Sequence, residues 1–323
     1  MSDSPPTPAE RSGDDRWERD VLRKLAENAL SEQRTARRWG IFFKSLTFLY
    51  LTAVLVMAAG WFGAREGTLG KHTALVDLNG VIEADSMASA DIVNAGLNDA
   101  FEDKNTQGVI LRINSPGGSP VQAHQINREI RRLRGKFPGT PLYVVVDDIC
   151  ASGGYYVAVA ADAIYVSRGS LVGSIGVLMD GFGFTGVMQK LGVERRLLTA
   201  GENKGFLDPF SPLEPRQRAF AEAMLGDIHK QFIAIVREGR GQRLKETPET
   251  FSGLFWTGDR SLEMGLADAV GDAAYVAREV VKAENIVDFT PRENIAERFA
   301  KRFGAALGEA MVKVAGANGA RVR

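Results

Sequence analysis

The chain has 323 residues, 40 Lys and Arg against 40 Asp and Glu, and one cysteine. The length allows one large or two modest domains, and the zero net charge disfavours a general nucleic-acid binder, which needs a basic surface. A single cysteine excludes an intrachain disulfide and thiolate metal clusters. The three histidines lie far apart without an H-E-x-x-H motif, which disfavours a zinc enzyme. We therefore expect no metal and no cofactor.

The first 64 residues have the features of a membrane anchor. Residues 1–44 combine a disordered start, rich in Pro, Ser and charge, with a charged helical pattern. Residues 45–64 carry no charge, and a helix of this length spans a hydrocarbon core of ~30 Å. Four Lys or Arg lie in residues 25–44 and two in residues 64–83, which favours a cytoplasmic N-terminus. The sequence predicts a single-pass inner-membrane anchor with an extracytoplasmic body; a buried helix or a cleaved signal peptide are the alternatives.

Residues 72–285 are expected to form the folded body. Apolar, β-branched runs alternate there with helical patterns, which predicts an α/β fold with a mainly parallel sheet covered by helices on both faces. The expected strands are 74–78, 108–113, 142–146 and 163–166. The expected helices are 88–101, 121–133, 153–161 and 215–238.

Residues 286–323 are expected to form a C-terminal tail. Apolar residues recur there every four positions between charged ones, from Ile295 to Met311, which predicts an amphipathic helix. This helix could pack on its own domain, on a neighbouring subunit or on the membrane surface.

A glycine pair follows the expected strand 108–113. Gly117 and Gly118 permit unusual backbone angles, and amide groups in such a turn can point at a negatively charged oxygen. A plain strand-to-helix turn is the alternative, and the spacing of a phosphate-binding loop is absent. The run 119–121 after the pair could hold a substrate backbone as an added strand.

Ser152 lies at a second junction, between the strand 142–146 and an Ala- and Val-rich helix. A helix N-terminus favours negative charge, so Ser152 could act as a nucleophile with the Gly153 amide stabilising the oxyanion. An ordinary helix-capping serine is the alternative. Cys150 is a rival nucleophile, although its apolar surroundings favour a buried thiol. The G-x-S-x-G motif is absent, which disfavours an α/β-hydrolase.

A nucleophilic serine needs a base, and the sequence offers histidine or lysine. His124 and His229 could complete a triad, but neither has a supporting local pattern, and the amphipathic surroundings of His229 predict a surface position. Lys204 lies in a loop rich in Gly, Pro and Phe. It could be a general base if it were desolvated, or simply a solvated lysine, and spacing alone does not select it.

Five segments together resemble the bacterial signal peptide peptidase SppA family, in its short, single-repeat form. The resemblance covers roughly residues 72–285 and the N-terminal anchor. The segments are NSPGGS (114–119), ASGGYY (151–156), LVGSIGV (171–177), GENKGFLDPF (201–210) and LFWTGDRSLEMGLADAVG (254–271). The resemblance implies a ClpP/crotonase-like fold and a membrane-anchored serine endopeptidase that uses a Ser-Lys dyad to degrade cleaved signal peptides.

The resemblance also implies roles for individual residues. Ser152 matches the nucleophile, Lys204 the general base and Ser174 the residue that orients the lysine. The oxyanion donors match Gly153 together with Gly117 or Gly118. Asp208 would favour a charged Lys204 if it faced it, so it must point away or have another partner. The implied partners are apolar peptides, membrane lipid and further copies of the same chain, with no nucleic acid.

Three other functions stay open at this point. A crotonase-like acyl-CoA enzyme would share the fold but would need a Glu or Asp base. A non-catalytic membrane scaffold would use the C-terminal helix for assembly. A protease of the same family could act on membrane proteins or lipoproteins in place of signal peptides.

Overall fold

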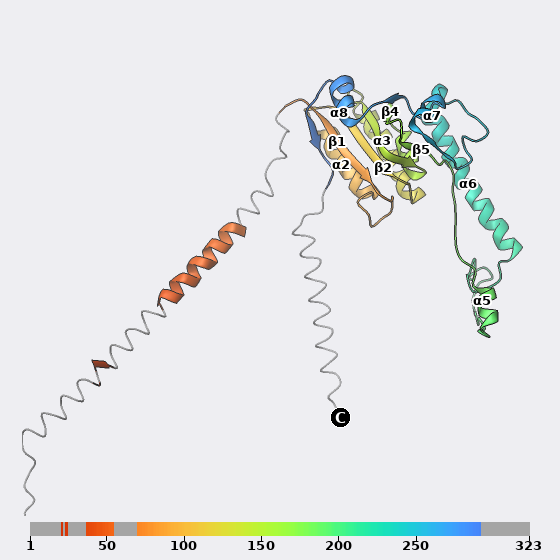
Figure 1. Cartoon of the computed structure of the whole chain (residues 1–323), viewed down its shortest axis with the longest axis horizontal. Helices are drawn as coiled ribbons and strands as arrows, with labels where there is room; N and C mark the ends of the chain where they lie inside the picture. The colour runs from red at the N-terminus through yellow and green to blue at the C-terminus, as the bar shows by residue number, and fades with distance from the viewer. Residues whose placement is uncertain (1–20, 22, 25–36, 55–69, 292–323) are drawn as a thin grey trace, which may run out of the picture. The chain divides into compact units, whose positions relative to one another are not determined.

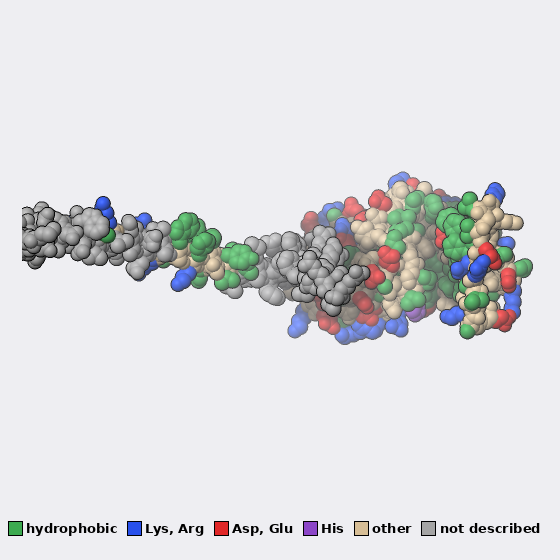
Figure 2. Space-filling model, turned by 90° about the horizontal axis from the view of Figure 1, so that it is seen from below, with side chains coloured by type: hydrophobic (Ala, Val, Ile, Leu, Met, Phe, Trp, Pro, Cys, Tyr) green, Lys and Arg blue, Asp and Glu red, His purple; other side chains and the backbone are tan. Residues whose placement is uncertain are grey.

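The computed structural model describes residues 21, 23–24, 37–54 and 70–291. It separates into two units, divided between residues 65 and 66 (Figure 1). In the first unit residues 37–54 are helical and exposed, and hydrophobic side chains lie at the surface of this helix (Figure 2).

The predicted anchor at 45–64 extends beyond this helix, because residues 55–69 lie outside the described part of the chain. Among the described residues, no helix combines the length and the apolar character needed to cross a membrane. Of the predicted tail, residues 292–323 also lie outside the described part. The anchor, its orientation and the amphipathic tail therefore stay predictions.

One eight-stranded sheet organises the second unit (Figure 1). Its main path runs β6-β5-β3-β2-β1-β8, while β4 pairs with β3 and β7 pairs with β4. Every pairing is parallel except that of β5 with β6, which confirms the predicted mainly parallel sheet. The strands are β1 (His72–Asn79), β2 (Thr106–Ser115), β3 (Leu142–Ala151), β4 (Ala163–Val166), β5 (Leu171–Gly173), β6 (Phe255–Thr257), β7 (Ala269–Val270) and β8 (Ile286–Asp288).

Helical segments cover both faces of the sheet. Neighbouring strand residues point to opposite sides, so each face carries apolar side chains that a helical segment buries. Leu111 faces the larger core, which also takes side chains from α2, α3 and α4, whereas Ile110 faces a smaller cluster completed by Val276. The helical segments are α2 (Ala90–Glu102), α3 (Pro120–Lys136), α4 (Gly153–Ala158), α5 (Thr185–Lys190), α6 (Pro215–Arg240), η1 (Gly241–Arg243), α7 (Gly258–Glu263), α8 (Ala273–Tyr275) and the π-helix η2 (Val276–Val281).

The predicted elements agree with these bounds, with two informative differences. β3 continues to Ala151, five residues beyond its predicted end, so that it leads directly to Ser152. β8 pairs with β1, although the sequence predicts a tail from residue 286 onward. Three residues are too few to show a period, so only the partner strand reveals β8.

Residues 177–214, here called the arm, leave the sheet after β5 and return through α6. The arm carries α5, which Figure 1 shows at the end of α6 away from the sheet. Its apolar side chains are widely exposed, with Phe182 at 81% and Leu198 at 94%. Such a large exposed apolar patch is unusual for a surface that faces only water.

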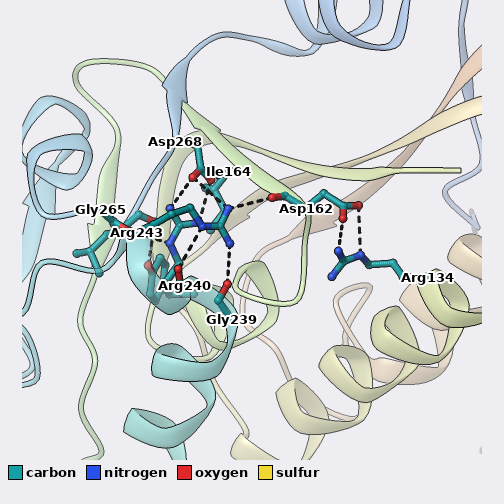
Figure 3. Close-up of polar contacts among 10 residues, drawn as sticks. Arg134, Asp162, Ile164, Gly239, Arg240, Arg243, Gly265 and Asp268 are labelled. Carbon is teal, nitrogen blue, oxygen red and sulfur yellow. Dashed lines mark hydrogen bonds and ion pairs between the residues drawn. The ribbon is translucent and has the colours of Figure 1, made fainter. Parts of the chain in front are cut away.

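A buried ion pair fixes the other end of α6 to the sheet (Figure 3). Arg240 is 2% exposed and donates from Nη1 and Nη2 to the two carboxylate oxygens of Asp268, each at 2.8 Å. Asp268 also accepts from the Ile164 amide of β4 at 2.7 Å and from Arg243 at 3.2 Å. Burial raises the pKa of the Asp268 carboxyl, but Arg240, the Ile164 amide and Arg243 together outweigh burial and hold that pKa below its ordinary value.

Candidate active site

Ser152 lies between the end of β3 and the start of α4, in a backbone conformation that residues other than glycine rarely adopt. Its φ is 50°, which costs free energy in a residue other than glycine. The Ser152 amide donates to the Gly173 carbonyl at 2.8 Å, and its carbonyl accepts from the Tyr156 amide at 2.9 Å. Its side chain does not cap α4. The strained backbone therefore presents a hydroxyl that the helix does not use.

The glycine pair lies directly against Ser152. A Cβ on Gly117 would stand 2.7 Å from the Ser152 Cβ and 2.6 Å from the Gly153 nitrogen, so only glycine allows this approach. Two backbone hydrogen bonds hold the pair open: the Ile82 amide donates to the Gly117 carbonyl at 2.9 Å, and the Ser119 amide donates to the Ile82 carbonyl at 2.7 Å.

Two backbone amides beside Ser152 are available to a negatively charged oxygen. The Gly117 amide donates to the Ser115 Oγ at 3.1 Å and is therefore occupied. Within the described residues, the amides of Gly118 and Gly153 donate to no protein acceptor. The Gly118 nitrogen would lie 3.2 Å from a Cβ built on Gly153, so the two amides are neighbours. Of the two glycines that the sequence left open, this geometry favours Gly118 as the oxyanion donor.

The suggested substrate strand at 119–121 is wrong. Ser119 is the N-cap of α3, its side chain accepts from the Gln122 amide, and Pro120 is the first helical residue. A serine followed by proline suits a helix start, because the proline lacks only an amide that the first turn leaves unpaired.

Ser174 lies beside Ser152 at the end of the neighbouring strand. Ala151 pairs with Gly173 in the parallel register of β3 and β5, so the two serines follow paired residues. Ser174 also has a φ of 50°. Its amide donates to the Leu254 carbonyl at 2.8 Å, and its carbonyl accepts from the Gly176 amide at 2.9 Å.

Lys204 lies in the arm and is exposed. The Lys204 loop is tied to the first turn of α6, where the Leu207 amide donates to the Gln217 Oε1 at 3.3 Å. The turn after Ser174 contacts α6 at His229, and the helix rises ~18 Å over the twelve positions from 217 to 229. One copy of the chain therefore brings Ser152, Ser174 and the glycines together but leaves Lys204 apart from them.

Asp208 does have another partner. It accepts a hydrogen bond from the Ser211 hydroxyl at 2.7 Å and from Arg195 at 3.2 Å. The Ser211 hydroxyl and the Arg195 guanidinium hold the pKa of Asp208 below its ordinary value. This carboxylate is thus charged and engaged within the arm.

The alternative catalytic residues, Cys150, His124 and His229, differ from Ser152 in their burial and contacts. Cys150 is fully buried, and desolvation raises the pKa of its thiol, which leaves it protonated and unreactive. His124 contacts the Tyr156 hydroxyl at 3.1 Å. His229 is part-buried and contacts the Ile175 carbonyl, so it lies only partly at the surface where the sequence places it. The signal was present in the sequence: His229, Phe232 and Val236 recur at helical spacing on one face.

A family model and several relatives of this chain are named as peptidases. The family model described as "Peptidase family S49" matches residues 136–287 of this chain. The chain is 28% identical to "Putative signal peptide peptidase SppA" of Enterococcus faecium over 70% of this chain and 67% of that protein. It is 30% identical to "Protease 4" of Haemophilus influenzae over 67% of this chain and 35% of that protein.

The highest of the reported identities, 46%, is to "Na(+)/H(+) antiporter NhaA" of Brucella melitensis, over 54% of this chain and 24% of that protein. This chain thus spans about a quarter of the Brucella protein, and most of that protein lies outside the match. The name of the Brucella protein refers to its whole length, of which the match covers only 176 residues.

Proposed function

The chain belongs, through residues 136–287, to peptidase family S49, and from this premise we propose that it is a serine endopeptidase whose nucleophile is Ser152. The observation that carries the proposal is the position of Ser152, strained at φ 50° beside two backbone amides without protein acceptors. We assign the body the ClpP/crotonase-like fold that the resemblance implies.

The proposed reaction is an acyl transfer in two steps. A neutral lysine amine takes the proton of the Ser152 hydroxyl while its oxygen attacks the peptide carbonyl, and the amides of Gly118 and Gly153 stabilise the oxyanion. The carbon–nitrogen bond then breaks, and the ammonium returns the proton to the leaving amine. Water attacks the acyl-serine with the same base, which releases the second product and restores the hydroxyl.

We propose Lys204 as that base, supplied by a neighbouring copy of the chain. The separation of ~18 Å along α6 keeps Lys204 of one copy away from its own Ser152. The exposed apolar side chains of the arm favour burial against a second copy. Such burial would also remove water from around the amine, which favours its neutral form. Ser174, next to Ser152, is placed to orient the incoming lysine.

The substrate class and the location are proposals that follow from the same resemblance. An apolar peptide such as a cleaved signal peptide suits an enzyme anchored in the inner membrane through residues 45–64, with a cytoplasmic N-terminus and an extracytoplasmic body. The uncharged stretch in the sequence and the relative named as a signal peptide peptidase support this proposal.

The test compares the full chain with Ser152→Ala and Lys204→Ala in two assays: cleavage of a synthetic signal peptide and labelling by a fluorophosphonate probe. We expect the wild type to cleave and to be labelled, Ser152→Ala to do neither, and Lys204→Ala to lose both by a factor on the order of 10²–10⁴. A wild-type protein that folds, assembles and takes no label would contradict the proposal and favour a scaffold.

A further inference from the structure

His229 joins α6 to the turn that follows Ser174. Its Nε2 lies 3.1 Å from the carbonyl oxygen of Ile175, and the imidazole is part-buried on the face of α6 that also carries Phe232 and Val236. A carbonyl oxygen only accepts hydrogen bonds, so Nε2 must carry the hydrogen. This holds for the neutral imidazole and for the imidazolium alike.

The hydrogen bond from His229 acts on the peptide unit between Ile175 and Gly176. The Ile175 carbonyl and the Gly176 amide belong to the same planar unit, and glycine permits that plane to turn more easily than other residues do. A side chain at position 176 would be crowded, because its Cβ would stand 3.0 Å from the Gly253 Cα. The buried Ile175 side chain anchors the residue, and the His229 hydrogen bond holds the carbonyl oxygen of its peptide plane.

The other end of the same peptide unit holds Ser174. The Gly176 amide donates to the Ser174 carbonyl at 2.9 Å, so a rotation of the plane breaks this bond together with the one to His229. Ser174 stands at φ 50°, a conformation that persists only when its surroundings hold it. The peptide unit 175–176 thus links His229 to Ser174 through two hydrogen bonds, one at its carbonyl and one at its amide.

We propose that His229 is a positioning residue for Ser174: its Nε2 hydrogen bond holds the peptide unit 175–176 and thereby the strained backbone at Ser174. The inference rests on the proposed function, in which Ser174 orients the lysine that activates Ser152. His229 gains this role from its hydrogen-bond donor, and it neither takes nor gives a proton in the reaction.

The test measures the rate at which the fluorophosphonate probe labels Ser152 in the full chain. In His229→Leu the donor is lost and we expect labelling to slow on the order of tenfold, the effect of about 1.4 kcal/mol. In His229→Gln the side-chain amide can donate from nearly the same place, and we expect labelling to recover to within about twofold of the wild type. Peptide cleavage should follow the same order.

Val236→Ala is the control for a merely structural role. It removes buried volume from the same face of α6 without touching the Ile175 carbonyl, so it should lower the thermal midpoint and leave labelling below that midpoint unchanged. Labelling of His229→Leu at the wild-type rate overturns the inference, and so does a His229→Gln variant as slow as His229→Leu. A wild-type chain without any labelling is a different result, since it contradicts the proposed function itself.

Discussion

Ser152 and Ser174 follow the ends of two neighbouring parallel strands, and each has a positive φ of 50°. The register of β3 and β5 pairs the residues that precede them, and the Ser152 amide donates to the Gly173 carbonyl at 2.8 Å. Each strained residue costs about 1–3 kcal/mol. Strain at two adjacent strand ends, beside a glycine pair, marks this edge of the sheet as the place where stability is lost for function.

Replacing Ser152 with glycine should therefore stabilise the protein while it abolishes cleavage. Glycine adopts φ 50° without the steric cost, so the free energy of unfolding should rise by about 1 kcal/mol. Ser152→Ala, which removes the hydroxyl but keeps the strain, is the matched control and should show no such gain. Urea unfolding of the three proteins measures the difference, and a Ser152→Gly variant less stable than Ser152→Ala would contradict the assignment of strain.

The glycine pair should not tolerate alanine. A Cβ on Gly118, whose φ is 148°, would lie 2.2 Å from the Ile82 carbonyl oxygen, so Gly118→Ala must displace either the amide or the Ile82 segment. We expect the rate of peptide cleavage to fall by about 10²–10³, the effect of removing one oxyanion donor. Gly139→Ala, at a site with open space around it, should cleave at the wild-type rate. Unchanged cleavage in Gly118→Ala would remove this glycine from the site.

The anchor of α6 predicts a specific dependence of stability on pH. Asp268→Asn leaves the buried Arg240 charge without its partner, which should lower the free energy of unfolding near neutral pH by about 3–5 kcal/mol. The pKa of Asp268 is depressed in the folded state, so its contribution is complete above the ordinary carboxyl pKa and is lost as the pH falls through the folded value.

The stability gap between wild type and Asp268→Asn should consequently narrow as the pH is lowered. Denaturant unfolding at several pH values measures it, with Glu263→Gln as the control because that carboxylate pairs with Arg260 at an exposed site. A gap that stays constant down to acidic pH would show that the Asp268 charge is not what stabilises α6.

A dyad shared between copies predicts complementation. Ser152→Ala and Lys204→Ala should each be inactive alone, but co-expression should restore cleavage, because one variant supplies the hydroxyl and the other the amine. The double variant co-expressed with Lys204→Ala lacks Lys204 in every copy and should stay inactive. Assemblies that contain both single variants and do not cleave would place the base elsewhere.

The sequence alone determined the type and order of the main elements. Apolar β-branched runs and helical spacing are properties of consecutive residues, so they predicted the parallel sheet, the strand 163–166 and the start of α6 at residue 215. The glycine pair and Ser152 were likewise visible as small residues at strand ends, where catalytic groups of α/β proteins are commonly found.

Only the tertiary structure decided which of these residues meet. Gly117 contacts Ser152 across 35 positions because β2 and β3 lie side by side, and Lys204 stands apart because α6 separates its loop from the sheet. The contact of His229 with the Ile175 carbonyl and the strand at 286–288 depended on partners far away in sequence. Local periodicity carries no information about such contacts, since they follow from strand register and helix length once the whole chain has packed.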